Sequence, residues 1–178
     1  MRGVKAEDVE EFTQFVHGRS PALLRTAFLL TSGDAHAAED LLQAALLQTL
    51  RHWRSIRDRQ SLERFVRQVM VNERRSWFRR RASSELVRDL RSETSQHDPA
   101  SARALQQVDD GNVLGPALAS LPRRQRVVVV LRYFDDLPEH EVALIMGCSV
   151  GTVKSQTSKA LAKLRLALAP ASREEHAT

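Results

Sequence analysis

The sequence predicts an all-α protein made of two small helical domains joined by a flexible linker. Apolar residues recur every three or four positions over most of the chain, which is the spacing of one helix face. This periodicity stops across residues 82–111, where Ser, Asp, Glu and Gln dominate, as expected of a flexible acidic linker. Beyond it, two apolar-periodic segments meet at the sharp break Gly147-Cys148-Ser149, which indicates a helix-turn-helix.

Four helices are expected before the linker. Residues 6–17 are amphipathic, and Gly18 is expected to end that first helix. Ser20-Pro21 should then open a second, almost entirely apolar helix that Gly33 stops. Asp34 should cap a third helix that reaches Trp53.

The third helix has a core face of leucine and alanine and a polar side away from it. The off-face residues are Glu39, Asp40, Gln43 and Gln48. Such residues are usually a solvated stripe on a bundle helix, but they also suit a docking surface for a large basic or amphipathic partner. Composition alone leaves both interpretations open.

The fourth helix is expected from Ser61, its possible cap, through Arg81, after a basic loop at residues 54–60. Its inward positions are Leu62, Phe65, Val66, Val69 and Met70. Seven arginines are expected to face away from the core: Arg64, Arg67, Arg74, Arg75, Arg79, Arg80 and Arg81. Trp77 and Phe78 lie among them. Cations interleaved with aromatic rings suit a surface that holds phosphates and stacks bases, although these two rings could equally anchor the helix end to the core.

The charge is unevenly distributed over the 178 residues, whose net charge is +5. Counting along the sequence gives −3 for residues 1–50, +8 for 51–81, −3 for 82–111 and +3 for 112–178. Two basic blocks on either side of an acidic one predict two polyanion-facing surfaces. The single cysteine fits a reducing compartment, and neither a signal peptide nor a bilayer-spanning segment is recognisable, so a soluble cytoplasmic protein without membrane insertion is expected.

After the linker, short helices are expected at Val113–Ser120 and Arg123–Phe134, followed by the helix-turn-helix. Gly147 tolerates the positive φ of a tight turn, and Ser149 can cap the second helix. The side of that helix away from Val153 and Leu161 presents short hydroxyls and cations near its N-terminus: Thr152, Lys154, Ser155, Ser158 and Lys159. These groups are suited to phosphate and base-edge contacts, although a helical hairpin with a solvated polar face would have the same pattern.

Catalytic and metal-binding patterns are not found in the sequence. There is no Gly-rich phosphate loop, the six histidines are scattered, and no cofactor or metal is expected. Asp135 and Asp136 look like turn residues rather than a catalytic pair. A nuclease or nucleotide-modifying enzyme therefore has little support.

The order of these segments resembles an extracytoplasmic-function sigma factor, a compact two-domain specificity subunit of bacterial RNA polymerase. Three motifs carry the resemblance, which covers the chain from about Glu10 to Leu168: Ala38-Glu39-Asp40-Leu41-Leu42-Gln43 running on to Leu50-Arg51-His52-Trp53; Phe65 through Arg81; and Leu121-Pro122-Arg123-Arg124-Gln125-Arg126 followed by Gly147 through Ser155. The amino-acid sequence of residues 149–165 is similar to that of the actinobacterial SigE family.

The resemblance implies three binding surfaces and a control partner. Core RNA polymerase, through its clamp and flap regions, would be bound at Glu39, Asp40, Gln43 and Leu47. The −10 promoter element would be bound by Arg54, Arg57, Arg64, Asn72, Arg75, Trp77, Arg79 and Arg80. The −35 element would be bound by Arg123, Arg124, Thr152, Lys154, Ser155, Gln156, Ser158 and Lys159. An anti-sigma factor would hold the protein inactive, and the polymerase, not this chain, would supply the bond chemistry.

The implied domains are a region-two domain at residues 6–82, the linker at 83–111, a region-four domain at 112–168 and a polar tail at 169–178. An autonomous helix-turn-helix regulator remains the alternative, since its C-terminal domain would look the same. Such a regulator would carry a ligand pocket, a receiver or a dimerisation helix in its N-terminal half, where Asp34–Arg81 instead resembles a clamp-plus-promoter module.

Overall fold

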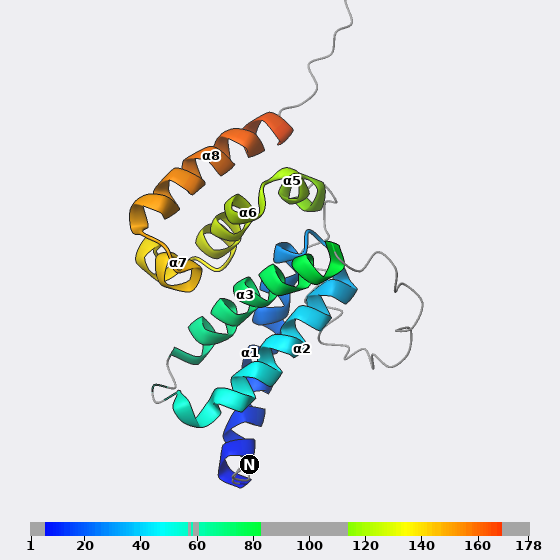
Figure 1. The fold of residues 1–178 in the computed structure, drawn as a ribbon, viewed down its shortest axis with the longest axis vertical. Coiled ribbons are helices and arrows are strands. Elements are labelled where there is room, and N and C mark those ends of the chain that lie inside the picture. The colour runs from blue at the N-terminus through cyan, green and yellow to red at the C-terminus, as the bar shows by residue number, and fades with distance from the viewer. Residues whose placement is uncertain (1–5, 57, 59–60, 83–113, 169–178) are drawn as a thin grey trace, which may run out of the picture.

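The computed structural model describes residues 6–56, 58, 61–82 and 114–168, and all of its regular elements are helical. The N-terminal half, called the region-two half after the resemblance seen in the sequence, contains α1 (Ala6–Leu30), α2 (Ala35–His52), the 3₁₀ turn η1 (Trp53–Ser55) and α3 (Leu62–Ala82). The C-terminal half, called the region-four half for the same reason, contains α5 (Leu114–Ser120), α6 (Arg123–Val129), the π-helical turn η3 (Val130–Phe134), α7 (Glu139–Met146) and α8 (Val150–Leu168). The predicted linker and tail lie outside the described residues. The all-α prediction is confirmed for the part described (Figure 1).

The first two predicted helices are one helix. The prediction that Gly18 ends the first of them is wrong, because α1 runs through Gly18 and Pro21 to Leu30. An internal proline removes the hydrogen bond to the carbonyl four residues earlier and usually costs about 3 kcal/mol. Tertiary packing on both sides of Pro21 offsets this cost, since Phe15 packs upstream against the core and Leu23 is fully buried downstream.

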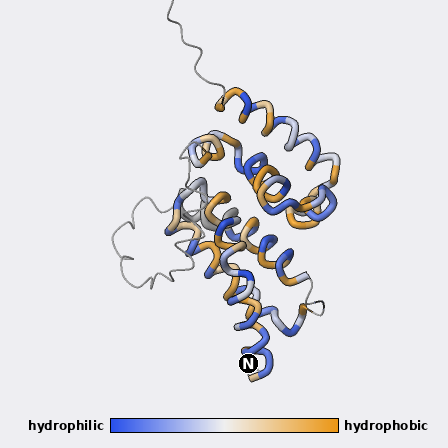
Figure 2. The backbone as a smooth tube through the Cα atoms, turned by 180° about the vertical axis from the view of Figure 1, so that it is seen from behind, coloured by the Kyte–Doolittle hydropathy of each residue, from blue (hydrophilic) through white to orange (hydrophobic). Residues whose placement is uncertain are grey.

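The helix α2 begins and ends close to the predicted positions. The Asp34 carboxylate accepts a hydrogen bond from the Ala37 amide at 2.9 Å, which confirms the predicted cap. Its leucine and alanine face packs against α1 and α3, while Trp53 after its C-terminus is buried and meets the ring of Phe12 edge-on at 5.3 Å. These contacts make α1, α2 and α3 a bundle, and Figure 2 shows apolar residues, in orange, recurring along the helices.

The helix-turn-helix has the predicted geometry. Gly147 ends α7 in the left-handed region at φ +60°, and the Cys148 amide donates to the Ala143 carbonyl at 3.0 Å. Ser149 then caps α8 by accepting from the Thr152 amide at 3.1 Å. Val153 and Ala160 are fully buried against the rest of this half, but Leu168 is exposed, so the core stripe of α8 ends before the helix does.

The valine-rich run after Arg123 is helical, as predicted, but it changes pitch. The chain continues from α6 into a π-helical turn, in which the Asp135 amide donates to the Val130 carbonyl at 3.1 Å. All five residues Val127–Leu131 are buried. Packing on every side therefore overrides the β propensity of the valines.

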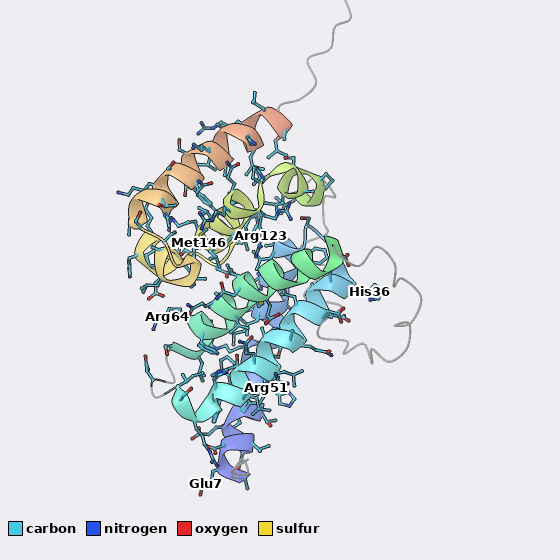
Figure 3. All side chains as sticks on the ribbon, viewed as in Figure 1. Glu7, His36, Arg51, Arg64, Arg123 and Met146 are labelled. Atoms are coloured by element: carbon cyan, nitrogen blue, oxygen red, sulfur yellow. The ribbon has the colours of Figure 1, made fainter. Side chains whose placement is uncertain are left out.

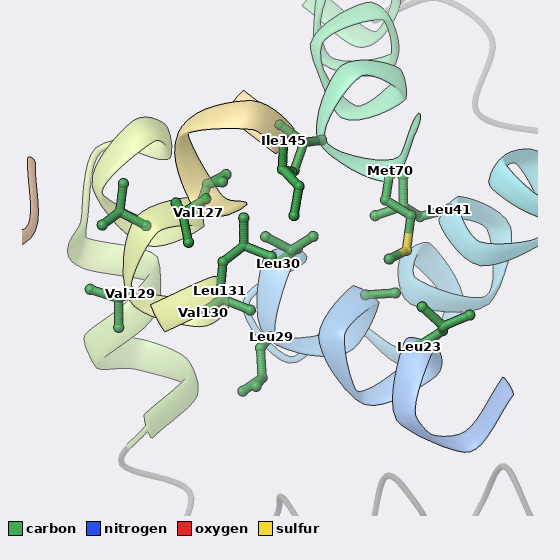
Figure 4. Close-up of a cluster of buried hydrophobic side chains, with 14 of the residues drawn as sticks. Leu23, Leu29, Leu30, Leu41, Met70, Val127, Val129, Val130, Leu131 and Ile145 are labelled. Atoms are coloured by element: carbon green, nitrogen blue, oxygen red, sulfur yellow. The ribbon is translucent and has the colours of Figure 1, made fainter. Parts of the chain in front are cut away.

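The two halves pack against each other through a continuous apolar cluster. Leu30 at the end of α1 lies beside Leu131 of η3 and Ile145 of α7 (Figure 4), and all three side chains are almost fully buried. Helices α3 and α7 are also in contact. The region-four half is therefore seated on α1 and α3 in this structure.

Candidate nucleic-acid and partner interfaces

The predicted DNA-facing side of α8 is solvent-exposed. Lys154, Ser155, Ser158 and Lys159 are exposed, and Thr152 and Gln156 are half-buried. On the opposite side, Val153 and Ala160 anchor the helix to α6 and α7. The arrangement holds a row of hydroxyls and ammonium groups on a rigid helix whose N-terminal turn also offers positive dipole charge, which suits contact with a duplex.

Two contacts orient the N-terminal turn of α8. The Thr152 hydroxyl lies 2.9 Å from the Ser149 hydroxyl, so both belong to the cap of the helix. Lys154 Nζ lies 3.7 Å from a Glu139 carboxylate oxygen at the start of α7, with the lysine side chain 65% exposed. Because an exposed pair of this kind contributes little, Lys154 can leave Glu139 for a phosphate at small cost.

The two arginines predicted for the −35 surface at the start of α6 differ in environment. Arg124 is exposed. Arg123 is half-buried and donates through Nη2 to the Val71 carbonyl of α3 at 2.6 Å. Figure 3 shows Arg123 at the junction of the two halves, so this residue bridges them in the present arrangement instead of facing solvent.

The predicted −10 residues are only partly described. Arg54 pairs with Asp8 at 2.9 Å, Arg64 on α3 (labelled in Figure 3) lies 3.5 Å from a Glu141 carboxylate oxygen of α7, and Asn72 is exposed. Arg57 and the side chains of Arg75, Trp77, Arg79 and Arg80 lie outside the described residues, although the last four belong to the helical backbone of α3.

The predicted polymerase-docking residues share one side of α2. Asp40, Gln43 and Leu47 are spaced by three and four residues, which aligns them along the helix, and all three are exposed. Glu39 beside them is half-buried. Leu47 is 58% exposed, so a large apolar side chain stands in an otherwise polar, solvent-facing row. Such a row is suited to docking another protein surface.

Arg67 was predicted to face away from the core, and this prediction is wrong. Arg67 is buried, with Nε 2.8 Å from Asp135 Oδ2 and Nη1 3.1 Å from Glu63 Oε2. Asp135 also accepts a hydrogen bond from the Thr26 hydroxyl at 2.7 Å. Asp135 was expected only to form a turn; it does end η3, but its side chain also joins the halves.

Arg126 has a structural role that its sequence context did not predict. Its guanidinium is buried and donates to the carbonyls of Leu118, Ala119 and Leu121 at 2.7–3.2 Å, which closes the C-terminal end of α5. A weaker contact at 3.5 Å reaches the Leu30 carbonyl of α1. Desolvation by burial lowers the pKa of Arg126 from its ordinary value, yet arginine remains charged in proteins. The position of Arg126 directly before the apolar run Val127–Leu131 was the one sequence feature that could have predicted its burial.

The described residues form neither a metal-binding cluster nor a membrane-spanning helix. Across residues 6–56, 61–82 and 114–168, the His, Cys, Asp and Glu side chains do not gather into a group able to hold a metal ion. None of the helices described is both long and apolar enough to cross a bilayer.

Two family models match the chain, and together they span both halves. Residues 15–84 match sigma-70 region 2, and residues 113–164 match sigma-70 region 4. The RNA polymerase sigma-E factor of Streptomyces coelicolor is 39% identical over 158 residues, which cover 89% of this chain and 86% of that protein. The ECF RNA polymerase sigma factor SigL of Mycobacterium tuberculosis is 33% identical over 151 residues, 82% of each chain.

A solved structure shares the arrangement. The sigma factor RpoE of Bartonella quintana, in complex with the anti-sigma factor NepR, superposes with a TM-score of 0.69 at 25% identity, over 89% of this chain and 97% of that one. The length, order and identity of these matches agree with the three sequence motifs. The chain therefore belongs to the extracytoplasmic-function sigma factors of the sigma-70 family, which confirms the resemblance seen in its sequence.

Proposed function

We propose that this sigma factor uses three separate surfaces to bring core RNA polymerase to a two-part promoter. Glu39, Asp40, Gln43 and Leu47 of α2 dock on the polymerase clamp, and the basic side of α3 engages the −10 element. The exposed side of α8 reads the −35 duplex, and the region-four half also meets the polymerase flap. The observation that carries this proposal is the solvent-facing row of hydroxyls and cations at the start of α8, on a helix-turn-helix of the expected geometry.

The division of labour follows from the chemistry of each surface. At the −35 duplex, Lys154, Lys159 and Arg124 neutralise phosphates, while Ser155, Gln156 and Ser158 reach base edges. At the −10 element, the arginines hold the backbone, and Trp77 accepts an unstacked base in the melted strand. The chain performs no bond chemistry in this scheme, so it acts as an initiation factor and not as an enzyme.

The domain limits are part of the same proposal. Region two occupies residues 6–82, region four residues 112–168, and residues 83–111 connect them through the polymerase as a linker. The linker must be long enough to let the two domains bind both promoter elements at once. The −10 and −35 elements are about 25 base pairs apart, which is roughly 85 Å along B-DNA at 3.4 Å per base pair.

Control by an anti-sigma factor and action in the cytoplasm complete the proposal. The similarity to RpoE, whose structure was solved in complex with the anti-sigma factor NepR, supports the first point. Affinity purification of the tagged chain from its native cells tests it. Recovery of a small inhibitor alongside or instead of polymerase is expected, and repeated recovery of polymerase alone would argue against an inhibitor.

The experiment that tests the function is transcription in vitro with purified core polymerase and a genomic promoter library, with and without the chain. New start sites preceded by a shared two-part motif are expected only when the chain is present. The matched protein controls are Lys159→Ala, which should lower the yield, and Arg165→Ala, an exposed cation farther along α8 that should not. Tight duplex binding by the chain alone, with no transcription, would instead identify an autonomous regulator.

A further inference from the structure

Asp135 of the region-four half is bound by two helices of the region-two half. One carboxylate oxygen accepts from the Thr26 hydroxyl of α1 at 2.7 Å, and the other pairs with Arg67 Nε of α3 at 2.8 Å. The side chains of Asp135 and Arg67 are only 9% and 10% exposed. A charged carboxylate this deeply buried is strongly destabilising unless its hydrogen-bond and ion-pair partners stay in place.

The ion pair continues outward along the surface of the region-two half. Arg67 also contacts Glu63 at 3.1 Å, and Glu63 contacts Arg19 at 2.8 Å. These four charges alternate in sign from Arg19 to Asp135, so Arg67 is positioned for Asp135 by groups of its own half. Asp135 is separated from Thr26 by 109 residues and from Arg67 by 68, which makes the contact a property of the assembled halves.

The same interface occupies two arginines proposed to bind promoter DNA. Arg64, proposed for the −10 element, pairs with Glu141 of α7. Arg123, proposed for the −35 element, donates to the Val71 carbonyl of α3. Each half therefore contacts an arginine of the other half that is proposed to bind DNA, and the Arg64 side chain stays 40% exposed.

While the two halves are in contact, which we call the closed arrangement, their DNA-binding surfaces are too close together to reach both elements of a two-part promoter. The helix α8 of 19 residues is about 28 Å long, and α3 and α7 are in direct contact, whereas the two promoter elements lie roughly 85 Å apart. The two halves must separate before both elements can be bound.

We propose that Asp135 is an autoinhibitory latch. Bound by Arg67 and Thr26, it holds the free chain closed with Arg64 and Arg123 in contact with the opposite half, and core polymerase must break the Asp135 contact to load the factor. The proposal rests on the proposed function for its regulatory meaning, but the closed state of the free chain can be measured without it.

The test compares Asp135→Asn with Asp136→Asn in the full chain. Asp136 is the exposed neighbour, and its positive φ of 51° is a conformation that asparagine accepts, so the control makes the same charge change beside the latch. Donor and acceptor dyes on Q14C and A162C, two exposed helical positions, in a Cys148→Ser background report the separation of the halves by single-molecule energy transfer. Far-UV circular dichroism checks that every variant is folded.

Asp135→Asn is expected to raise the open fraction at least threefold, and Asp136→Asn to leave it unchanged. If Asp135→Asn unfolds the chain, Thr26→Val is the milder variant: it removes one hydrogen bond from the carboxylate, keeps the ion pair and should raise the open fraction by a smaller factor. An open fraction that does not change in the folded latch variant would overturn the proposal, as would an equal change in the control.

The apparent affinity for core polymerase tests the regulatory part. When the competent state is a minor fraction, the apparent dissociation constant falls in proportion as that fraction rises. A threefold rise in the open fraction should therefore tighten core binding about threefold. Opening without tighter binding would overturn the inhibitory role, whereas failure of every variant, wild type included, to bind core would contradict the proposed function and leave the energy-transfer result on the latch intact.

Discussion

Arg126 Nε donates to the Leu118 carbonyl at 2.7 Å, and this bond joins the start of the valine-rich helix α6 to the end of α5. The same guanidinium serves the carbonyls of Ala119 and Leu121, which the end of α5 would otherwise leave without helical partners. One side chain thus holds together the N-terminal corner of the region-four half.

We expect Arg126→Met to lower the free energy of unfolding by about 3 kcal/mol, because buried carbonyls lose their donors while the apolar volume is kept. Urea denaturation followed by far-UV circular dichroism measures the loss. Arg124→Met is the control: this neighbouring arginine is exposed, and the change should stay within about 0.5 kcal/mol. Equal effects of the two substitutions would show that the carbonyl contacts of Arg126 contribute nothing.

Two glycines of the chain should respond oppositely to alanine. At Gly147 an added Cβ meets no atom within 4 Å, but the φ of +60° disfavours any side chain, so Gly147→Ala should cost about 1–2 kcal/mol. Gly18 lies inside α1, where an added Cβ also meets no atom within 4 Å and φ is not positive. Because alanine favours the helix more than glycine does, Gly18→Ala should stabilise the chain by about 0.5–1 kcal/mol.

The same urea denaturation experiment measures both substitutions. Stabilisation by Gly147→Ala would mean that the turn between α7 and α8 does not need its left-handed residue. Destabilisation by Gly18→Ala would mean that α1 is interrupted at that point, as the sequence alone had suggested.

Local patterns predicted most helices because their signals are short-ranged. The Asp34 and Ser149 caps and the turn at Gly147 depend on residues within four positions, and the structure has all three. The continuation of α1 through Pro21 could not be predicted in this way, because the packing that offsets the proline involves side chains such as Trp53 that are distant in sequence.

The contacts between the halves were not predictable for a related reason. Arg67 belongs to a run of arginines that periodicity assigns to solvent, and its burial depends on Asp135, 68 residues away. The exposed side of α8 was easier to predict, because the apolar stripe containing Val153 and Ala160 fixes the opposite side of the same helix. Residues 83–113 and the side chains at the end of α3 lie outside the described part of the chain.

The exposed leucine on α2 provides a test of polymerase docking. We expect Leu47→Gln to weaken core binding about tenfold, because a large apolar side chain within a polar row typically acts as an anchor in a partner's pocket. Titration of core polymerase with fluorescently labelled chain measures the affinity. Stability should change little, since Leu47 is 58% exposed.

Leu166→Gln is the matched control for that experiment. Leu166 is also an exposed leucine on a helix, but it lies near the end of α8, far along the chain from the docking residues. An equal loss of core binding in both variants would indicate a general effect of surface hydrophobicity. No loss at Leu47 would exclude this side of α2 as the clamp-docking surface.

Lys154 provides the sharpest test of DNA contact by α8. We expect Lys154→Ala to weaken binding of the holoenzyme to its promoter and to reduce the slope of log affinity against log salt by about 0.9, the value for one lost phosphate contact on B-DNA. The Glu139 pair at 3.7 Å does not oppose this, because an exposed ion pair breaks at little cost.

Arg165→Ala separates a phosphate contact from a general effect of charge. Arg165 is an exposed cation on nearly the same side of α8, and 11 residues place it about 16 Å farther along the axis. Arg165 should not reach a duplex that contacts the N-terminal turn of α8. The slope of log affinity against log salt for Arg165→Ala should therefore match that of the unaltered chain. If both variants shift the slope equally, the dependence reflects the net charge of the region-four half. If neither does, Lys154 does not touch a phosphate and the bound DNA lies elsewhere on the helix-turn-helix.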